Sequence, residues 1–92
     1  MTQHRKTLET IGMHRVELTS PTGKRTLVTR WLTTDQNQWR TAFVIPQPSR
    51  PEGFSRQDIH ELVETLQSAL AEADELEAHL PNHSGPVTNP DR

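Results

Sequence analysis

Five histidines are the first residues to consider for chemistry, because imidazole nitrogens bind transition metals. His79 and His83 are four residues apart, but Pro81 lies between them and ends any helix that would place both on one face. Glu75 and His79 share a helical face, yet two ligands without a third do not make a metal site. We therefore expect no metal.

The residue types needed for catalysis are also not assembled into a site. The chain has no cysteine, no serine stands in a nucleophile-elbow pattern, and the four glycines are isolated, so no phosphate-binding loop is expected. Glu61 and Glu64 form the best carboxylate pair, but they fall on the solvent side of a predicted helix. A chain of 92 residues has little room for a closed cleft. We expect neither an enzyme nor a cofactor or small-molecule substrate.

Three arginines, Arg15, Arg30 and Arg40, are predicted to share the outer face of a small sheet. Such a face can contact the phosphates of a nucleic acid or an acidic protein. It can also be simply solvated, with the arginine stems covering neighbouring valines. Two observations count against a nucleic acid: no aromatic residue is predicted on this face, and the isoelectric point is near 6.2.

The elements that must position these residues begin with three strands. Residues 13–20, 25–33 and 39–45 alternate in polarity and are rich in β-branched residues. Turn residues separate them, with a Pro-Thr-Gly-Lys turn at 21–24 and Asn37 as the candidate for a left-handed position in the second loop. The segment before Met13 is harder to assign, and Gly12 marks a bulge or a break.

The loops also predict a register for the sheet. Closing the first hairpin around Thr22-Gly23 places Leu18 opposite Leu27 and His14 opposite Trp31. Closing the second around Gln36 places Thr29 opposite Phe43 and Leu27 opposite Ile45. In this register Trp31 and Trp39 both face the core, although exposure near the second hairpin would make them anchors for a partner.

A helix over about residues 56–80 is the clearest prediction. Ser55 and Asp58 have capping-box spacing, and Pro81 ends the pattern. Apolar residues recur at spacings of three and four: Ile59, Leu62, Leu66, Ala69, Ala73, Leu76 and Leu80. Residues 81–92 contain three prolines and little to bury, so they are expected to form a disordered tail.

The second half of this helix is the candidate surface for a protein partner. Small residues in its seam allow another helix to approach closely. The candidates are Ala69, Ala73, Leu76 and Leu80, flanked by Glu72 and Glu75. The alternatives are a helix end that is frayed and solvated, and one that pairs with a second copy or a foreign protein. A thin core favours a homodimer on stability grounds.

Charge is divided unequally along the chain. Residues 1–54 carry eight basic and four acidic side chains, whereas residues 55–80 carry one basic and seven acidic side chains. Such a separation is typical of an interaction surface, but it also arises when a basic sheet packs beside an acidic helix. No apolar run approaches the roughly 20 residues of a membrane span. We expect a cytoplasmic protein that does not bind membranes.

Residues 53–77, GFSRQDIHELVETLQSALAEADELE, resemble the closing helix of short uncharacterised proteins of actinobacteria and their phages. Those proteins join a small β-rich region to an amphipathic helix that opens with Leu-(Ser/Thr)-Pro. Phe54-Ser55 matches this opening, while Arg56 stands where proline is usual. The resemblance implies a small accessory protein of a phage, a mobile element or its host, and no catalytic residue.

Together these patterns predict a single α+β domain over residues 1–80, in which a three-stranded antiparallel meander packs against one long C-terminal helix. The predicted function is that of a small non-enzymatic protein-binding accessory module acting on a host protein. The alternative is a nucleic-acid-binding regulator that uses Arg15, Arg30 and Arg40.

Overall fold

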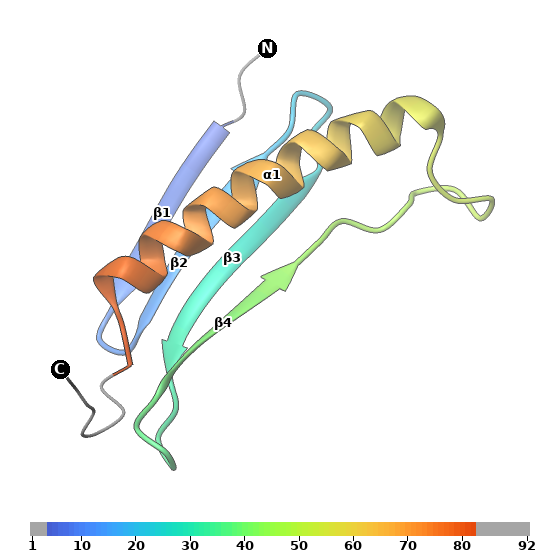
Figure 1. Ribbon diagram of the computed structural model, residues 1–92. Helices are drawn as coiled ribbons and strands as arrows, with labels where there is room; N and C mark the ends of the chain where they lie inside the picture. Colours follow the sequence, from blue (N-terminus) through green and yellow to red (C-terminus); the bar gives the residue numbers. More distant parts are fainter. Residues whose placement is uncertain (1–3, 83–92) are drawn as a thin grey trace, which may run out of the picture.

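A computed structural model describes residues 4–82 as a four-stranded antiparallel sheet with one helix across it (Figure 1). The strands are β1 (His4–Thr10), β2 (Met13–Thr19), β3 (Arg25–Leu32) and β4 (Trp39–Val44), in the spatial order β1-β2-β3-β4. The helix α1 (Arg56–His79) lies diagonally over one face, mainly above β2 and β3. The α+β class is confirmed, and no element within residues 4–82 covers the other face of the sheet.

The helix follows its sequence signals closely. Ser55 is the N-cap, and its hydroxyl accepts from the Asp58 amide while the Asp58 carboxylate accepts from the Ser55 amide. Both halves of the predicted capping box are therefore present. The helix ends at His79, before Pro81, and Asn37 adopts the predicted left-handed conformation with φ of 54°.

The prediction of three strands was wrong, because β1 adds a fourth. All seven of its residues are exposed, so the segment has no buried face to give it a polarity pattern. It pairs with β2 through a two-residue turn at Ile11-Gly12. Gly12 has a φ of 85°, which explains a glycine at this point.

The predicted register was wrong by one residue, and β3 therefore turns its other face to the helix. Leu18 pairs with Thr26, and His14 with Arg30, instead of the expected pairs with Leu27 and Trp31. The cause is the first loop, which spans residues 20–24. The Ser20 amide donates to the Lys24 carbonyl, and the Ser20 hydroxyl accepts from the Lys24 amide, so the loop has an odd number of residues.

The register of the second hairpin is also shifted by one residue, in the direction that compensates for the shift in the first hairpin. Val28 pairs with Phe43, and Thr29 with Ala42, so β2 and β4 keep the faces that their sequences predict. Only β3 is inverted. It places Thr26, Val28 and Arg30 under the helix and leaves Leu27 and Trp31 on the uncovered face. Because a strand alternates strictly, a one-residue shift exchanges every side chain between the two faces.

The core between α1 and the sheet is small. Its buried apolar residues are Val16, Leu18, Val28, Ala69 and Ala73. Polar contacts tie the helix to the sheet along its length: Arg5 binds Glu72 at 2.6 Å, Lys24 binds Asp58 at 3.2 Å, and the Thr22 hydroxyl donates to Glu61 at 2.7 Å. These contacts hold the helix to the sheet and its loop at Asp58 and Glu61 in the first half of α1 and at Glu72 in the second half.

Thr26 gives a direct test of the observed register. Its side chain is fully buried, and its hydroxyl has no hydrogen-bond partner within residues 4–82. We expect Thr26→Val to raise the free energy of unfolding by about 1 kcal/mol, because valine keeps the shape and removes an unpaired buried hydroxyl. Thr29→Val on the opposite face of β3 is the matched control, with the same change in strand propensity. Urea denaturation measures both, and equal changes in the two variants would contradict the inverted β3.

Asn82 closes the described part of the chain. Its side-chain amide donates to the Trp39 carbonyl at 3.0 Å, and its side-chain oxygen accepts from the Trp39 amide, so it binds the start of β4. From residue 83 onward the expected tail lies outside the described residues. Within the described range, no helix is long and apolar enough to cross a membrane.

Candidate functional site: the open sheet face

The uncovered face of the sheet gathers most of the unusual side chains of the molecule. Because alternate residues of each strand share a face, the register defines its members. We call this surface the open face. Its basic residues are Lys6, Arg15, Arg25 and Arg40, its acidic residue is Glu17, and its apolar residues are Leu8, Met13, Leu27, Trp31, Ala42 and Val44.

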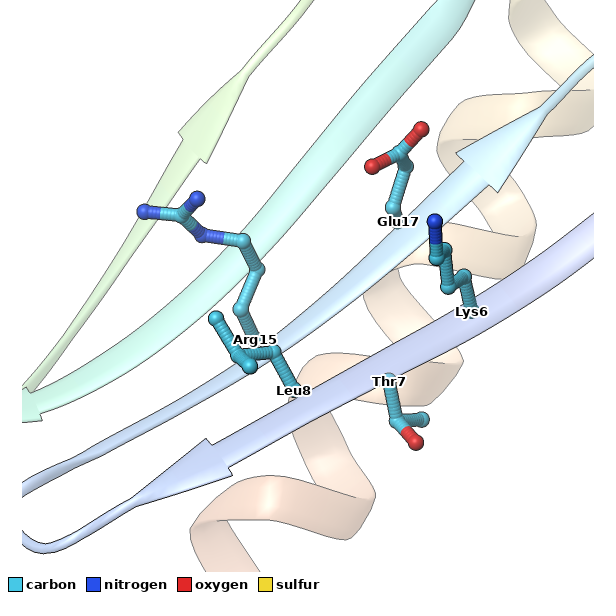
Figure 2. Close-up of a pocket in the computed structure, with 5 residues that line it drawn as sticks. All are labelled: Lys6, Thr7, Leu8, Arg15 and Glu17. Atoms are coloured by element: carbon cyan, nitrogen blue, oxygen red, sulfur yellow. The ribbon is translucent and has the colours of Figure 1, made fainter.

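Arg15 lies at the centre of the open face. Figure 2 shows its side chain extending from β2 across β3, with Lys6 and Glu17 side by side on the neighbouring strands. A hollow of about 270 Å³ lies on the β1 side of Arg15, and one of about 290 Å³ on the β3–β4 side. The Arg15 Nε atom is buried and has no hydrogen-bond partner among the residues described. Arg15 thus separates two shallow hollows and keeps an unused donor between them.

Trp31 supplies the aromatic group that the predicted register placed in the core. It pairs with Met13 on β2 and with Arg40 on β4, so its ring stands between these side chains on the open face. The ring is half-buried. Arg40 donates to the Gln36 side chain at 2.8 Å, which holds its guanidinium close to the hairpin end of the sheet. The aromatic ring of Trp31 therefore has the cationic side chain of Arg40 beside it on the open face.

The two faces of the molecule carry opposite charge. Seven acidic residues lie on α1, which covers the other face, while Glu17 is the one acidic residue among the open-face positions of the strands. Two of the helix acids are fixed at the β2–β3 loop. The Ser55 amide and the Lys24 ammonium lower the pKa of Asp58, and the hydroxyls of Ser20 and Thr22 lower the pKa of Glu61. These two carboxylates therefore stay ionised at neutral pH, on the side of the sheet that the helix covers.

The structure divides the three predicted arginines between the two faces. Arg15 and Arg40 lie on the open face, as expected. Arg30 does not, because the inverted β3 turns it under the helix, where it is 6% exposed. Its Nε donates to the Leu80 carbonyl at 2.9 Å and its Nη1 to the Thr41 hydroxyl at 2.7 Å. Arg30 thus binds the end of α1 to the sheet and is not available to a ligand.

The partner-binding candidates on the helix are largely used within the chain. Ala69 and Ala73 are buried against the sheet, and Leu76 packs against the same core. Leu80 is the C-cap and is half-buried, and Glu72 pairs with Arg5. Glu75 is exposed, and its carbonyl contacts the His79 ring. The alanine seam was expected to meet a second helix, but it meets the chain's own sheet.

A different part of the helix is left exposed. Five large apolar side chains, each more than 40% exposed, lie on α1 and on the strand and connector beside it: Phe43, Ile45, Ile59, Val63 and Leu70. We call this second surface the apolar flank. It lies on the side of the sheet that the helix covers, and it is therefore separate from the open face.

The chain matches no family model, no curated protein and no solved structure at a significant level. Among residues 4–82, no three His, Asp or Glu side chains are grouped so that they could hold a metal ion.

Among the open-face residues, the sequence alone did not place Lys6, Arg25, Leu27 and Trp31 on this face. Lys6 lies on the strand that was not predicted, and the others depend on the orientation of β3. A usable signal was present in Ser20, because a serine four residues before Lys24 can close a loop with an odd number of residues. That choice of loop would have placed Trp31 on the face of Arg15 and Arg40.

Proposed function

We propose that this protein is a non-enzymatic nucleic-acid-binding module that holds single strands on its open face. The observation that carries the proposal is that Trp31 shares one sheet face with four basic side chains and one acidic side chain, and that Arg40 is its direct neighbour on β4. Proteins that bind single strands combine a cationic surface for the phosphates with aromatic rings on which bases stack.

Two features of the fold, the inverted β3 and the acidic helix behind the sheet, answer the two objections that the sequence raised. The first was the lack of an aromatic residue beside the arginines, and Trp31 now stands next to Arg40. The second was the acidic isoelectric point, and the acidic residues responsible lie mainly on α1, behind the sheet. A nucleic-acid strand that approaches the open face meets a local excess of positive charge, although the whole chain has a formal charge of −2.

The positions of the arginines on the open face favour single-stranded nucleic acid over a duplex. Neighbouring β-strands lie about 4.8 Å apart, and Arg40 on β4 is displaced by two residues from the position level with Arg15 on β2, so the backbones of the two arginines are separated by about 12 Å. Arginines at this spacing can contact phosphates on both sides of a base that stacks on Trp31. In a duplex the flat face of each base is already stacked inside the helix, and only its edges remain accessible.

A second candidate function is the protein-binding accessory module that the sequence favoured. The apolar flank supports it, because several large apolar side chains exposed on one side of a small protein are typical of an interaction site. The two functions use different surfaces, so a substitution on one leaves the other intact.

Tryptophan fluorescence tests the nucleic-acid proposal directly. In the Trp39→Phe variant, Trp31 is the remaining tryptophan, and an oligodeoxythymidylate should quench its emission by stacking. Binding should weaken with salt, with a slope of log K against log salt of about −3 if all four basic residues contact phosphates. Arg15→Ala with Arg40→Ala should reduce that slope by about 1.4, whereas Arg56→Ala on the helix is the matched control and should leave it unchanged.

Two further measurements separate the possible ligands. Heparin, a polyanion without bases, should compete but should not quench Trp31, and duplex DNA should bind more weakly than the single strand. Trp31→Ala should weaken oligonucleotide binding by about 1–3 kcal/mol, the usual effect of removing one stacking ring. Unchanged emission and no salt-sensitive binding at low ionic strength would refute the proposal and leave the protein-binding function.

A further inference from the structure

The exposed and buried apolar residues of this chain are distributed in an unusual way. The buried core consists of two valines, one leucine and two alanines. Larger side chains stay outside, and five of the eight exposed large apolar residues in the described range form the apolar flank. Their exposed fractions run from 41% for Phe43 to 59% for Leu70. A folded monomer would gain more by burying these side chains than it gains from its alanine seam.

The helical part of the flank is one continuous stripe. Ile59, Val63, Leu66 and Leu70 follow each other at spacings of four, three and four residues, so they lie on one side of α1. Ile59, Val63 and Leu70 are exposed, and Leu66 is half-buried. The stripe spans twelve residues, from Ile59 to Leu70, and extends over about 17 Å of helix.

Polar contacts show which side of α1 carries this stripe. Glu61 and Glu72 reach the β2–β3 loop and β1, respectively, on the opposite side of the helix. Glu77 lies seven residues after Leu70, on the same side as the stripe, and accepts from the Thr41 hydroxyl of β4 at 3.0 Å. The stripe therefore faces the β4 edge of the sheet. There Phe43 and Ile45 lie nearby, and the connector 45–55 runs out beyond the sheet before it turns back into α1 (Figure 1).

We propose that a second copy of this chain covers the apolar flank, with the two α1 helices antiparallel about a two-fold axis. The stripe is its own complement in this arrangement. When the axis passes between residues 64 and 65, Ile59 of one copy lies opposite Leu70 of the other, and Val63 lies opposite Leu66. In a two-fold interface the same surface of each copy contacts the other copy, so that surface must be complementary to itself.

Charge complementarity supports the same arrangement. Arg56, the one Lys or Arg of the helix, lies before the stripe on the same side, and Asp74 lies beyond its other end. Both side chains are exposed. Antiparallel pairing brings Arg56 of each copy to the level of Asp74 of the other, and two-fold symmetry produces this pair twice. Parallel pairing would instead bring the acidic ends together and separate each arginine from the acids.

The proposed interface leaves the nucleic-acid site free. Phe43 lies on the helix-covered side of β4, whereas the open face carries Arg40, Ala42 and Val44 of the same strand. Phe43 and Ile45 widen the contact beyond the two helices. The dimer therefore stands or fails independently of the proposed function.

Sedimentation equilibrium of the full chain at tens of micromolar tests the proposal. The wild-type chain should sediment as a dimer. Leu70→Glu should weaken self-association by at least tenfold, because the leucine is exposed in one copy and buried in the pair. Ala71→Glu is the matched control, since it places the same charge on the adjacent exposed position outside the stripe. Circular dichroism should report equal helix content in both variants.

Charge reversal tests the antiparallel arrangement separately. Arg56→Glu and Asp74→Arg should each weaken the dimer by about tenfold, because symmetry turns two attractive pairs into repulsive ones. The double variant should restore wild-type association. A wild-type monomer at all concentrations, or a dimer that resists Leu70→Glu, overturns the interface. A double variant weaker than either single variant overturns the antiparallel arrangement.

Discussion

Replacing Ala69 with glutamate is expected to abolish the folded state. Ala69 is fully buried where α1 crosses the sheet, in a core whose other members are Val16, Leu18, Val28 and Ala73. A glutamate there would bury an unpaired carboxylate or force the helix away from the sheet, at a cost of several kcal/mol. A domain of this size has only a few kcal/mol of stability in total.

Ala71→Glu controls for the helix itself. Ala71 is exposed, so the same substitution changes helix propensity equally without entering the core. Thermal unfolding followed by circular dichroism should show a cooperative transition for wild type and Ala71→Glu and none for Ala69→Glu. Equal midpoints in the two variants would mean that the alanine seam does not pack on the sheet. The seam would then be exposed and would again be a candidate site for a partner.

The sequence predicted the helix well because several independent local signals agree there. The capping box of Ser55 and Asp58, the apolar periodicity and Pro81 all act within a few residues of the boundaries they set. The three predicted strands also lie within one or two residues of their observed ends. Local chemistry therefore gave the type and length of most elements.

The face that β3 turns toward the helix was harder to predict, because it depends on whether the loop before β3 has an odd or an even number of residues. β3 carries apolar residues on both faces, Val28 on one and Leu27 and Trp31 on the other, so its own pattern does not choose between them. A side-chain hydrogen bond of Ser20 decides the matter, and this choice buries Thr26 and Arg30 while it exposes Trp31. An element with a clear pattern fixes its face locally, whereas β3 takes its face from the loop.

β1 and the exposed helix stripe were missed for related reasons. β1 is an edge strand with every residue exposed, so alternation left no trace in its sequence. The alanines were considered a partner site because small residues in a helical seam allow a second helix to approach closely. In the structure α1 lies close to the sheet because Ala69 and Ala73 are small, and its larger residues remain on the flank.

Arg30→Met is expected to lower the free energy of unfolding by about 2–3 kcal/mol. Methionine keeps much of the apolar stem of Arg30 but removes the donors to the Leu80 carbonyl and the Thr41 hydroxyl. The Glu77 carboxylate, 4.0 Å from Nη1, also loses this neighbouring cation and keeps the Thr41 hydroxyl as its donor. The end of α1 should therefore detach first, and the melting temperature should fall by about 10–20 °C.

Arg40→Met is the matched substitution on the open face, and the pair should show opposite effects in two assays. Arg40 is exposed and donates to Gln36, so its loss should change stability by no more than about 0.5 kcal/mol. In the oligonucleotide titration the order reverses: Arg40→Met should weaken binding and its salt dependence, while Arg30→Met, measured well below its melting temperature, should bind as wild type does. If Arg30→Met lost affinity while remaining folded, Arg30 would belong to the binding surface, as its sequence position first indicated. If Arg40→Met lost stability and kept its affinity, the arginines of the open face would serve the fold, and the apolar flank would be left as the functional surface.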